Sequence, residues 1–108
     1  MKISKVDEFS IRFDNGNFIT FFHEQDCCEH NYADFSQLEE LAFDTEFEED
    51  LMFEEVPDSG FRFGNEGKMF FIPCYSDQNG YYSDDIYIIY NGKKAIYLQC
   101  EERDNFWI

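Results

Sequence analysis

The alternation of apolar and polar residues predicts short antiparallel strands along most of the chain. Residues 9–13 alternate in the way that a half-buried strand requires. Asn15-Gly16 follows, a pair that favours a two-residue hairpin turn because both residues tolerate positive φ angles. Residues 18–22 are predicted to be the return strand, so the first element is a hairpin over residues 9–22.

The region after residue 44 is predicted to be an antiparallel meander. Gly, Pro, Asn and Asp gather in four short turn sequences, at residues 57–60, 64–67, 77–80 and 91–92. The clearest strand pair is 86–90 with 95–100, because Asn91-Gly92 joins two runs rich in Ile and Tyr. The meander accounts for most of the predicted sheet.

Two residues of this sheet have predicted environments. By the strand period of two, Ile96, Leu98 and Cys100 share one face. Cys100 is therefore expected to be a small buried apolar residue. Pro73 lacks a backbone N–H donor, so the strand over residues 70–75 is expected to be an edge strand or to be bulged there.

Residues 34–44 have a different pattern, which predicts one short α-helix. Asp34 is placed to cap the first free amides, and Gln37 three positions later completes a pattern like a capping box. Helical spacing puts four apolar residues on one face: Phe35, Leu38, Leu41 and Ala42. The helix is expected to end near residues 43 and 44. The predicted fold class is α+β, a mostly antiparallel sheet with one short helix, in a single domain over residues 1–108.

Composition indicates a folded protein despite a net charge of −16. Apolar residues make up 44% of the 108 positions and aromatic residues 20%, which excludes a disordered acidic tail. No apolar run approaches the ~20 residues of a membrane-spanning helix, and the N-terminal residues lack the apolar core of a signal peptide. A cytoplasmic location with no membrane partner is expected, where cysteines are thiols or metal ligands more often than disulfides.

The charge is unevenly distributed. Residues 14–61 contain fifteen Asp or Glu and no Lys or Arg. This half is not expected to bind nucleic acid directly, because nucleic-acid affinity depends largely on cations that displace counterions. Its field would instead attract basic protein surfaces, including those that normally hold DNA or RNA. An equally open interpretation is that the acidic surface only keeps a small protein soluble.

Residues 23–30, His-Glu-Gln-Asp-Cys-Cys-Glu-His, concentrate groups that bind metals. Thiolate and imidazole ligands suit a tetrahedral zinc ion, and the segment supplies four: His23, Cys27, Cys28 and His30. Adjacent cysteines point in opposite directions on an extended chain, so both reach one ion only in a tight turn. Cys74 or Cys100 is an alternative ligand from a neighbouring strand. Asp26 and Glu29 are candidates for ligands or for groups that orient the imidazoles.

Two other interpretations of this segment remain open. The first is a hydrogen-bonded turn between strand and helix, with buried thiols. The second is a catalytic site in which Cys27 or Cys28 is the nucleophile and His23 lowers the pKa of its thiol. The surrounding carboxylates oppose that shift, and the sequence has no nucleophile elbow, phosphate-binding glycine loop or dinucleotide fingerprint. The protein is therefore expected not to be an enzyme.

Residues 79–83, Asn-Gly-Tyr-Tyr-Ser, admit two interpretations. The first is a turn, because Asn-Gly alone explains the local sequence. The other is a second wall that faces the cysteine segment, with the hydroxyl of Tyr81 or Tyr82 donating to Asp26 or Glu29. The turn is the favoured interpretation.

The two motifs together resemble a family of small phage and bacterial proteins of unknown function. The shared features are H-x-Q-D-C-C-E at residues 23–29 and N-G-Y-Y-S at residues 79–83, within a resemblance that spans roughly residues 18–90. His30 and Gln78 depart from the family pattern, in which a small residue and a Ser are usual. The resemblance implies a phage or prophage setting and brings no established activity.

The acidic half suggests a function in that setting. Residues 44–58 carry eight carboxylates in fifteen positions, interleaved with apolar residues that would anchor the segment. Carboxylates that project outward at intervals would imitate the charges of a nucleic-acid strand. Small acidic proteins of phage type resemble inhibitors of host defence nucleases, including anti-CRISPR proteins. The leading hypothesis is a non-enzymatic inhibitor that binds the basic, nucleic-acid-handling surface of a host nuclease, with a structural zinc ion at the cysteine segment.

This hypothesis assigns the contact with the partner to seven carboxylates of the acidic half. They are Asp44, Glu46, Glu48, Glu49, Asp50, Glu54 and Glu55. The alternative is a metal- or ligand-binding module with a housekeeping role, whose acidity serves solvation alone. The two hypotheses differ in whether these carboxylates contact a partner.

Overall fold

The computed structural model describes residues 1–25, 28–78 and 82–104. Within these residues the chain forms ten strands and two short 3₁₀ turns, and the molecule measures 42 × 25 × 22 Å along its principal axes. The strands are β1 (Ile3–Val6), β2 (Ser10–Phe13), β3 (Phe18–Phe22), β4 (His30–Ala33), β5 (Met52–Val56), β6 (Gly60–Asn65), β7 (Lys68–Gln78), β8 (Asp85–Tyr90), β9 (Lys93–Gln99) and β10 (Glu101–Asp104). The 3₁₀ turns are η1 (Phe35–Gln37) and η2 (Glu40–Asp44).

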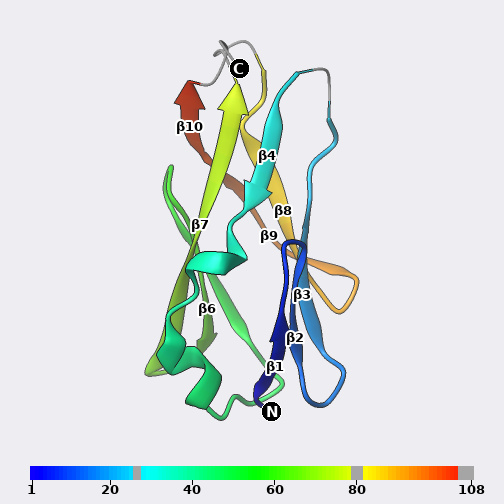
Figure 1. Cartoon of the computed structure of the whole chain (residues 1–108), viewed down its shortest axis with the longest axis vertical. Helices are drawn as coiled ribbons and strands as arrows, with labels where there is room; N and C mark the ends of the chain where they lie inside the picture. The colour runs from blue at the N-terminus through cyan, green and yellow to red at the C-terminus, as the bar shows by residue number, and fades with distance from the viewer. Residues whose placement is uncertain (26–27, 79–81, 105–108) are drawn as a thin grey trace.

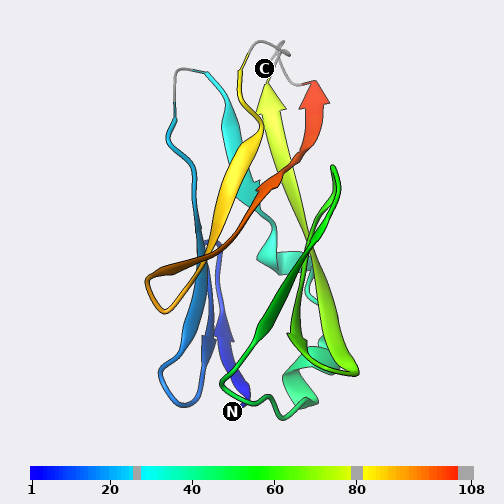
Figure 2. The same cartoon turned by 180° about the vertical axis from the view of Figure 1, so that it is seen from behind.

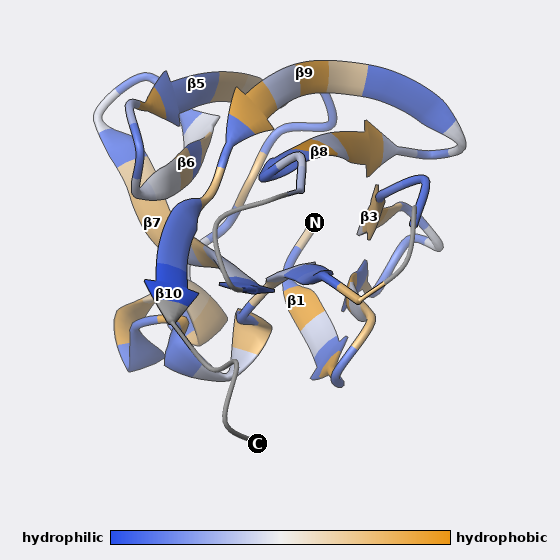
Figure 3. Cartoon of the chain, turned by 90° about the horizontal axis from the view of Figure 1, so that it is seen from above, coloured by the Kyte–Doolittle hydropathy of each residue, from blue (hydrophilic) through white to orange (hydrophobic). Residues whose placement is uncertain are grey.

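The strands form two sheets whose buried faces share one core (Figures 1 and 2). The first sheet has the order β1-β2-β3-β8-β9. The second has the order β10-β7-β6-β5, and β4 pairs with the other edge of β7. The β10–β7 ladder is parallel and the other ladders of the described residues are antiparallel. Seen from above, the strands surround a common interior (Figure 3).

Alternating residues fill the core between the two sheets. On β6, Phe61 and Phe63 are fully buried, while Arg62 between them is exposed. On β8 of the first sheet, Ile86 and Ile88 are buried in the same way. Full burial of one such side chain contributes roughly 1.5–3 kcal/mol. The opposed apolar faces therefore hold the sheets together.

Phe47, in the loop between η2 and β5, joins the two sheets near the N-terminus. Its side chain is buried, and its ring lies 5.8 Å from the ring of Phe13 and 5.8 Å from that of Phe70. Phe13 belongs to β2 of the first sheet and Phe70 to β7 of the second. Edge-to-face packing of these rings thus closes this end of the core.

The predicted α-helix is wrong, and the fold is not α+β but mostly antiparallel sheet. In the described residues the helical elements are η1 and η2 alone, and neither is long or apolar enough to cross a membrane. Leu38 and Glu39 lie between them with extended backbones, at ψ angles of 129° and 137°. Two short turns therefore replace a continuous helix over residues 34–44.

The capping residues that led to the helix prediction stabilise the first of these turns instead. Asp34 accepts a hydrogen bond from the Ser36 amide at 3.2 Å, as a cap does. Gln37 Nε2 donates to the carboxylate of Asp34 at 2.9 Å, so the two side chains close η1 locally. Isolated helices of fewer than about 12 residues are marginal in water. Packing against the sheets decides the backbone here, and Leu41, expected inside, is 60% exposed.

The connectivity differs from a continuous meander. The first hairpin is confirmed as β2 and β3, and the chain from β5 to β7 is a meander as predicted. After β7 the chain crosses to the first sheet, where β8 pairs with β3 and β9. The sequence pattern does not predict β1, β4 or β10, which are four residues each and carry little periodicity.

The prediction for Cys100 is confirmed, and so is the edge position of Pro73, because residues 68–73 of β7 pair with β6 alone among the described strands. Cys100 is 1% exposed. Pro73 lies inside β7, which has β6 along one part of its length and β4 along the next. Pro73 pairs with Gly60 at the end of the β6 ladder, and its carbonyl accepts the Asp34 amide just past the end of β4. The missing donor of Pro73 therefore falls where β7 changes partners.

Candidate functional site

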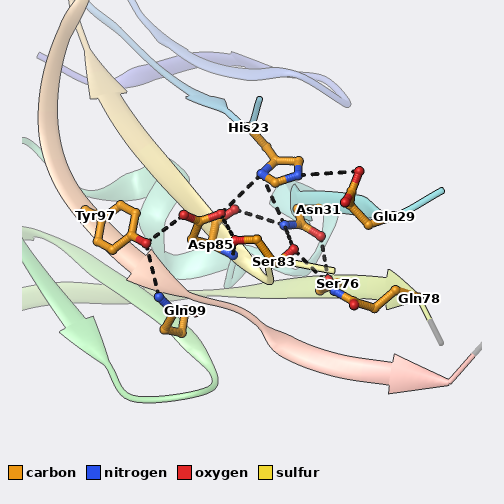
Figure 4. A network of polar contacts seen from close by, with 9 residues as sticks. All are labelled: His23, Glu29, Asn31, Ser76, Gln78, Ser83, Asp85, Tyr97 and Gln99. Carbon is orange, nitrogen blue, oxygen red and sulfur yellow. Dashed lines mark hydrogen bonds and ion pairs between the residues drawn. The ribbon is translucent and has the colours of Figure 1, made fainter. Parts of the chain in front are cut away.

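A polar network with a buried centre lies at the end of the molecule opposite the N-terminus, where β4, β7 and β8 meet (Figures 1 and 4). We call it the His23 network. Its members are His23, Glu29, Asn31, Ser76, Gln78, Ser83, Asp85, Tyr97 and Gln99. The inner face of β7 explains why a polar cluster forms here. Its inward residues change from Phe70, Ile72 and Cys74 to Ser76 and Gln78, so the core becomes polar toward this end.

His23 follows β3 and lies between two carboxylates. Its side chain is 8% exposed, with Nδ1 3.5 Å from Asp85 Oδ1 and Nε2 4.0 Å from Glu29 Oε1. Glu29 is 1% exposed. A neutral imidazole has a single N–H group, so it can donate to only one of the two carboxylates. A protonated imidazolium has two N–H groups and can donate to both. His23 Nε2 has no hydrogen-bond partner among the described residues.

Asn31 is the centre of the network. It lies on the inner face of β4, and its Nδ2 donates to the carbonyl oxygens of Ser83 at 3.0 Å and Asp85 at 2.9 Å. The same nitrogen is 3.2 Å from His23 Nδ1. Its Oδ1 accepts from the hydroxyl of Ser76. One side chain thus connects the loop after β3, strands β4 and β7, and the segment that leads into β8.

Gln78 extends the network along β7. Its Nε2 donates to Ser76 Oγ at 2.6 Å and to the Ser83 carbonyl at 3.3 Å, and its Oε1 accepts the Tyr82 amide at 2.8 Å. Both Ser76 and Gln78 are buried. Because a buried polar group without a partner costs roughly 1–3 kcal/mol, these reciprocal bonds fix how the three strands meet.

Asp85 carries the network outward to β9. Its Oδ2 accepts the Tyr97 hydroxyl at 2.6 Å, and its Oδ1 accepts the hydroxyl of Ser83. Gln99 Nε2 donates in turn to the Tyr97 hydroxyl at 3.3 Å. Burial alone would raise the pKa of Asp85, but these hydrogen bonds and His23 outweigh it and lower that pKa below its ordinary value. Asp85 is therefore a carboxylate at neutral pH, and its hydrogen bond raises the pKa of Tyr97.

A pocket of about 480 Å³ opens beside the network, with His23, Asp85 and Tyr87 in its wall. Lys94 Nζ lies 4.2 Å from the centre of the Tyr87 ring, a cation–π contact at the rim. The network joins several segments through hydrogen bonds that satisfy one another, which is the arrangement that rigidifies a fold.

The four predicted zinc ligands are not gathered in one place by the described residues. His23 faces the inner side of β4, while His30 lies on the outer side, exposed and stacked on Tyr32 at 4.7 Å. Cys28 is exposed and disulfide-bonded, contrary to the expectation of a thiol or metal ligand, and in that state it has no thiolate to offer a zinc ion. Cys27 and Asp26 lie outside the described residues. In the described residues no group of three or more His, Cys, Asp or Glu is placed to hold a metal ion, and a zinc ion at residues 23–30 stays a prediction.

The remaining cysteines, Cys74 and Cys100, are free thiols in the core. Burial raises the pKa of the Cys74 thiol to about 12, and burial also raises that of Cys100. Both are therefore protonated at neutral pH, a state that neither binds zinc nor acts as a nucleophile. Packing in the core accounts for both residues.

The N-G-Y-Y-S motif is described only at Tyr82 and Ser83. Its first three residues lie outside the described residues, and with them Tyr81, one of the two tyrosines of the alternative hydroxyl contact. Ser83 does face the segment after β3, since its carbonyl accepts from Asn31. That contact uses the backbone and not a tyrosine hydroxyl. The inward residues of β7 were detectable in the sequence, because Ser76 and Gln78 continue the period of two begun by Phe70.

All seven predicted partner-binding carboxylates are exposed, and the segment that carries them begins beside η2, near the N-terminal end of the molecule. We call residues 44–55 the acidic segment. It runs from the end of η2 through a loop into β5. Of the apolar residues expected to anchor it, Phe47 and Leu51 are buried in the core, whereas Met52 is 45% exposed. Two of the seven carboxylates are in ion pairs, Glu46 with the N-terminal amine and Glu54 with Arg62.

The fold and the His23 network define a small two-sheet β-protein with a polar end to its core. Residues 1–88 match the model of a domain of unknown function, DUF7448, so the chain belongs to that family. The match includes every member of the His23 network except Tyr97 and Gln99. No curated protein and no solved structure matches the chain.

Proposed function

We propose that this protein is a non-enzymatic inhibitor that binds the basic, nucleic-acid-handling surface of a host defence nuclease, in the manner of anti-CRISPR proteins. The observation that supports this most directly is a row of exposed carboxylates, Glu48, Glu49 and Asp50, held on an ordered backbone. None of the three makes an ion pair within the described residues. Their charge is therefore available to a partner.

The backbone of residues 48–50 is fixed from two strands. Asn65 of β6 accepts the Glu48 amide at 2.7 Å and donates to the Asp50 carbonyl at 3.3 Å. The Tyr90 hydroxyl donates to the Glu49 carbonyl at 2.8 Å. Carboxylates on a fixed backbone lose less conformational entropy on binding than carboxylates on a mobile loop. The charges are thus arranged before any partner arrives.

The distribution of charge favours a basic partner over other partners. With 24 acidic and 8 basic residues the chain repels nucleic acid and attracts cationic surfaces. Surfaces that bind DNA or RNA are dense in Lys and Arg, and their association with an acidic protein is steered electrostatically. In this proposal the inhibitor occupies the nucleic-acid site and acts in the cytoplasm of the infected cell.

The test is inhibition of purified bacterial defence nucleases by charge-reversed variants. We expect Glu48→Lys/Glu49→Lys/Asp50→Lys to weaken inhibition by about tenfold or more, and we expect inhibition by the unaltered protein to fall as salt rises. A matched control reverses three exposed carboxylates elsewhere, Glu66, Glu101 and Glu102. Equal losses in both triple variants, or inhibition that is insensitive to salt, would contradict the proposal.

A further inference from the structure

A second pocket, of about 560 Å³, lies between the β1–β2 turn and the start of η1. Aromatic rings form much of its wall: Phe9, Phe21, Tyr32 and Phe35. The Phe21 and Phe35 rings pack at 5.9 Å, and Phe35 is 1% exposed, so this wall is anchored in the core. Phe9 is 62% exposed at the mouth. We call this the aromatic pocket.

Three carboxylates, Asp7, Glu8 and Asp34, also line the pocket, beside Val6, His30, Ala33 and Ser36. Asp7 Oδ1 accepts the amides of Phe9 at 2.9 Å and Ser10 at 2.8 Å, and the first of these bonds is the main reason that the pKa of Asp7 is lowered. Hydrogen bonds outweigh burial to lower the pKa of Asp34 as well. Both groups are therefore anions at neutral pH, held in fixed directions.

The lining of the pocket contains no Lys or Arg; it does contain the imidazole of His30, which stacks on the Tyr32 ring at 4.7 Å. Lys5 and Arg103 lie close enough to act on Asp7 and Asp34 electrostatically, but neither is part of the wall. Glu8 is exposed and makes no ion pair within the described residues. Asp7 and Asp34 already accept hydrogen bonds from the chain, so Glu8 is the carboxylate of the wall that accepts none from the described residues, and the lining as a whole carries more acidic than basic groups. A cavity with aromatic faces and an excess of carboxylates is complementary to a cation, which gains from ring faces and from anions together.

The protein holds one guanidinium of its own in this way. Arg103 lies 4.1 Å from the centre of the Tyr75 ring, donates from Nε to Asp77 Oδ1 at 3.0 Å, and donates to the Tyr32 hydroxyl. Ring stacking and a directed carboxylate bond act together on a single planar group. The aromatic pocket offers the same two kinds of contact without an occupant from the described chain.

We propose that the aromatic pocket receives an arginine side chain of the basic partner. This proposal rests on the proposed function and adds a point of specific recognition to a general attraction of charges. Arginine fits better than lysine, because its flat guanidinium stacks on rings and bonds carboxylates at the same time, whereas an ammonium is a strongly hydrated point charge. A neutral apolar side chain would leave the carboxylates without a partner.

The probe is the peptide acetyl-Gly-Gly-Arg-Gly-Gly-amide, titrated into the labelled protein by NMR. We expect amide shifts at residues 6–9 and 30–36. The lysine peptide should bind several-fold more weakly, and the citrulline peptide, which keeps the shape and lacks the charge, about tenfold more weakly. Shifts elsewhere in the chain, or equal binding of the citrulline peptide, would overturn the proposal.

A matched pair of variants separates the pocket from overall charge. Phe9→Ala/Glu8→Gln alters the mouth and leaves the turn made by Asp7 in place, whereas Phe22→Ala/Glu66→Gln makes the same chemical changes elsewhere. Phe9 and Phe22 are 62% and 50% exposed, so both variants are expected to fold. We expect tenfold weaker arginine-peptide binding in the first and less than twofold change in the second. Equal losses of arginine-peptide binding in both variants would show that the peptide is attracted by overall charge, and would overturn the proposal that the pocket binds it.

Nuclease inhibition distinguishes failure of this proposal from failure of the proposed function. Inhibition that is lost on reversal of residues 48–50 but unchanged in Phe9→Ala/Glu8→Gln would overturn the role of the pocket and leave the proposed function standing. Arginine-peptide binding at the pocket without inhibition of any nuclease would overturn the proposed function and support the cation site alone. Loss of inhibition in both variants would support both proposals.

Discussion

The two ends of the molecule use polar residues in opposite ways. At one end, Asn31, Ser76 and Gln78 are buried and bond to one another and to backbone carbonyls. At the other end, the carboxylates of Glu48 and Asp50 project into solvent from a backbone held by Asn65. Buried polar groups that satisfy each other specify a structure, and exposed charges without partners leave it unchanged. The comparison assigns structure to the first end and binding to the second.

The largest expected effect is on stability, at the buried end. Asn31→Ala removes the donor to two carbonyls and the acceptor of the Ser76 hydroxyl, and we expect a loss of about 3 kcal/mol in the free energy of unfolding. Urea unfolding measures it. The control is His30→Ala on the outer face of the same strand, with an expected loss below about 1 kcal/mol. Similar losses of unfolding free energy in both variants would contradict the role of the His23 network in stability.

A smaller effect is expected in the pH dependence of stability. The folded-state pKa of Asp85 lies below its ordinary value of 3.8, so Asp85 contributes stability that is present above pH 3.8 and lost as pH falls through the folded pKa. The difference in unfolding free energy between the unaltered protein and Asp85→Asn should therefore shrink as pH falls from 5 to 2. Asp84, whose pKa is raised by burial and also by the charges of Asp58 and Asp85, contributes with the opposite sign; taking the difference removes the part due to burial and Asp58 and leaves only the coupling of Asp84 to Asp85. A constant difference would contradict this assignment.

The two ends also differ in how far their sequences predict them. The exposure of the acidic segment follows from its charge, and its anchors Phe47 and Leu51 are two of the apolar residues interleaved with the carboxylates. The hydrogen bonds that fix it come from Asn65 and Tyr90 on other strands, and no local pattern predicts them. Composition is thus enough to predict which groups face solvent, and tertiary structure decides how they are held.

The His23 network was predictable only in pieces. The motif around His23 identifies two members, His23 and Glu29, and the period of two along β7 identifies Ser76 and Gln78. Their meeting point depends on Asn31, which bonds the Ser83 carbonyl 52 positions away and lies on a four-residue strand with no clear pattern. Such contacts follow from the packing of two sheets, the same tertiary effect that replaced the predicted helix by η1 and η2.

The smallest expected effect on stability gives the sharpest contrast between the ends. Glu48→Gln/Glu49→Gln/Asp50→Asn removes three charges but keeps an acceptor at Glu49, whose Oε1 takes a bond from Asn15 at 2.8 Å. Relief of repulsion among neighbouring carboxylates favours the folded state. We therefore expect the free energy of unfolding of the variant to exceed that of the unaltered protein by no more than about 0.5 kcal/mol. Thermal and urea unfolding measure it, beside the nuclease assay. A loss of more than about 1 kcal/mol would show that these carboxylates stabilise the fold, as Asn31 does. The His23 network and the acidic segment would then no longer differ in their contribution to stability.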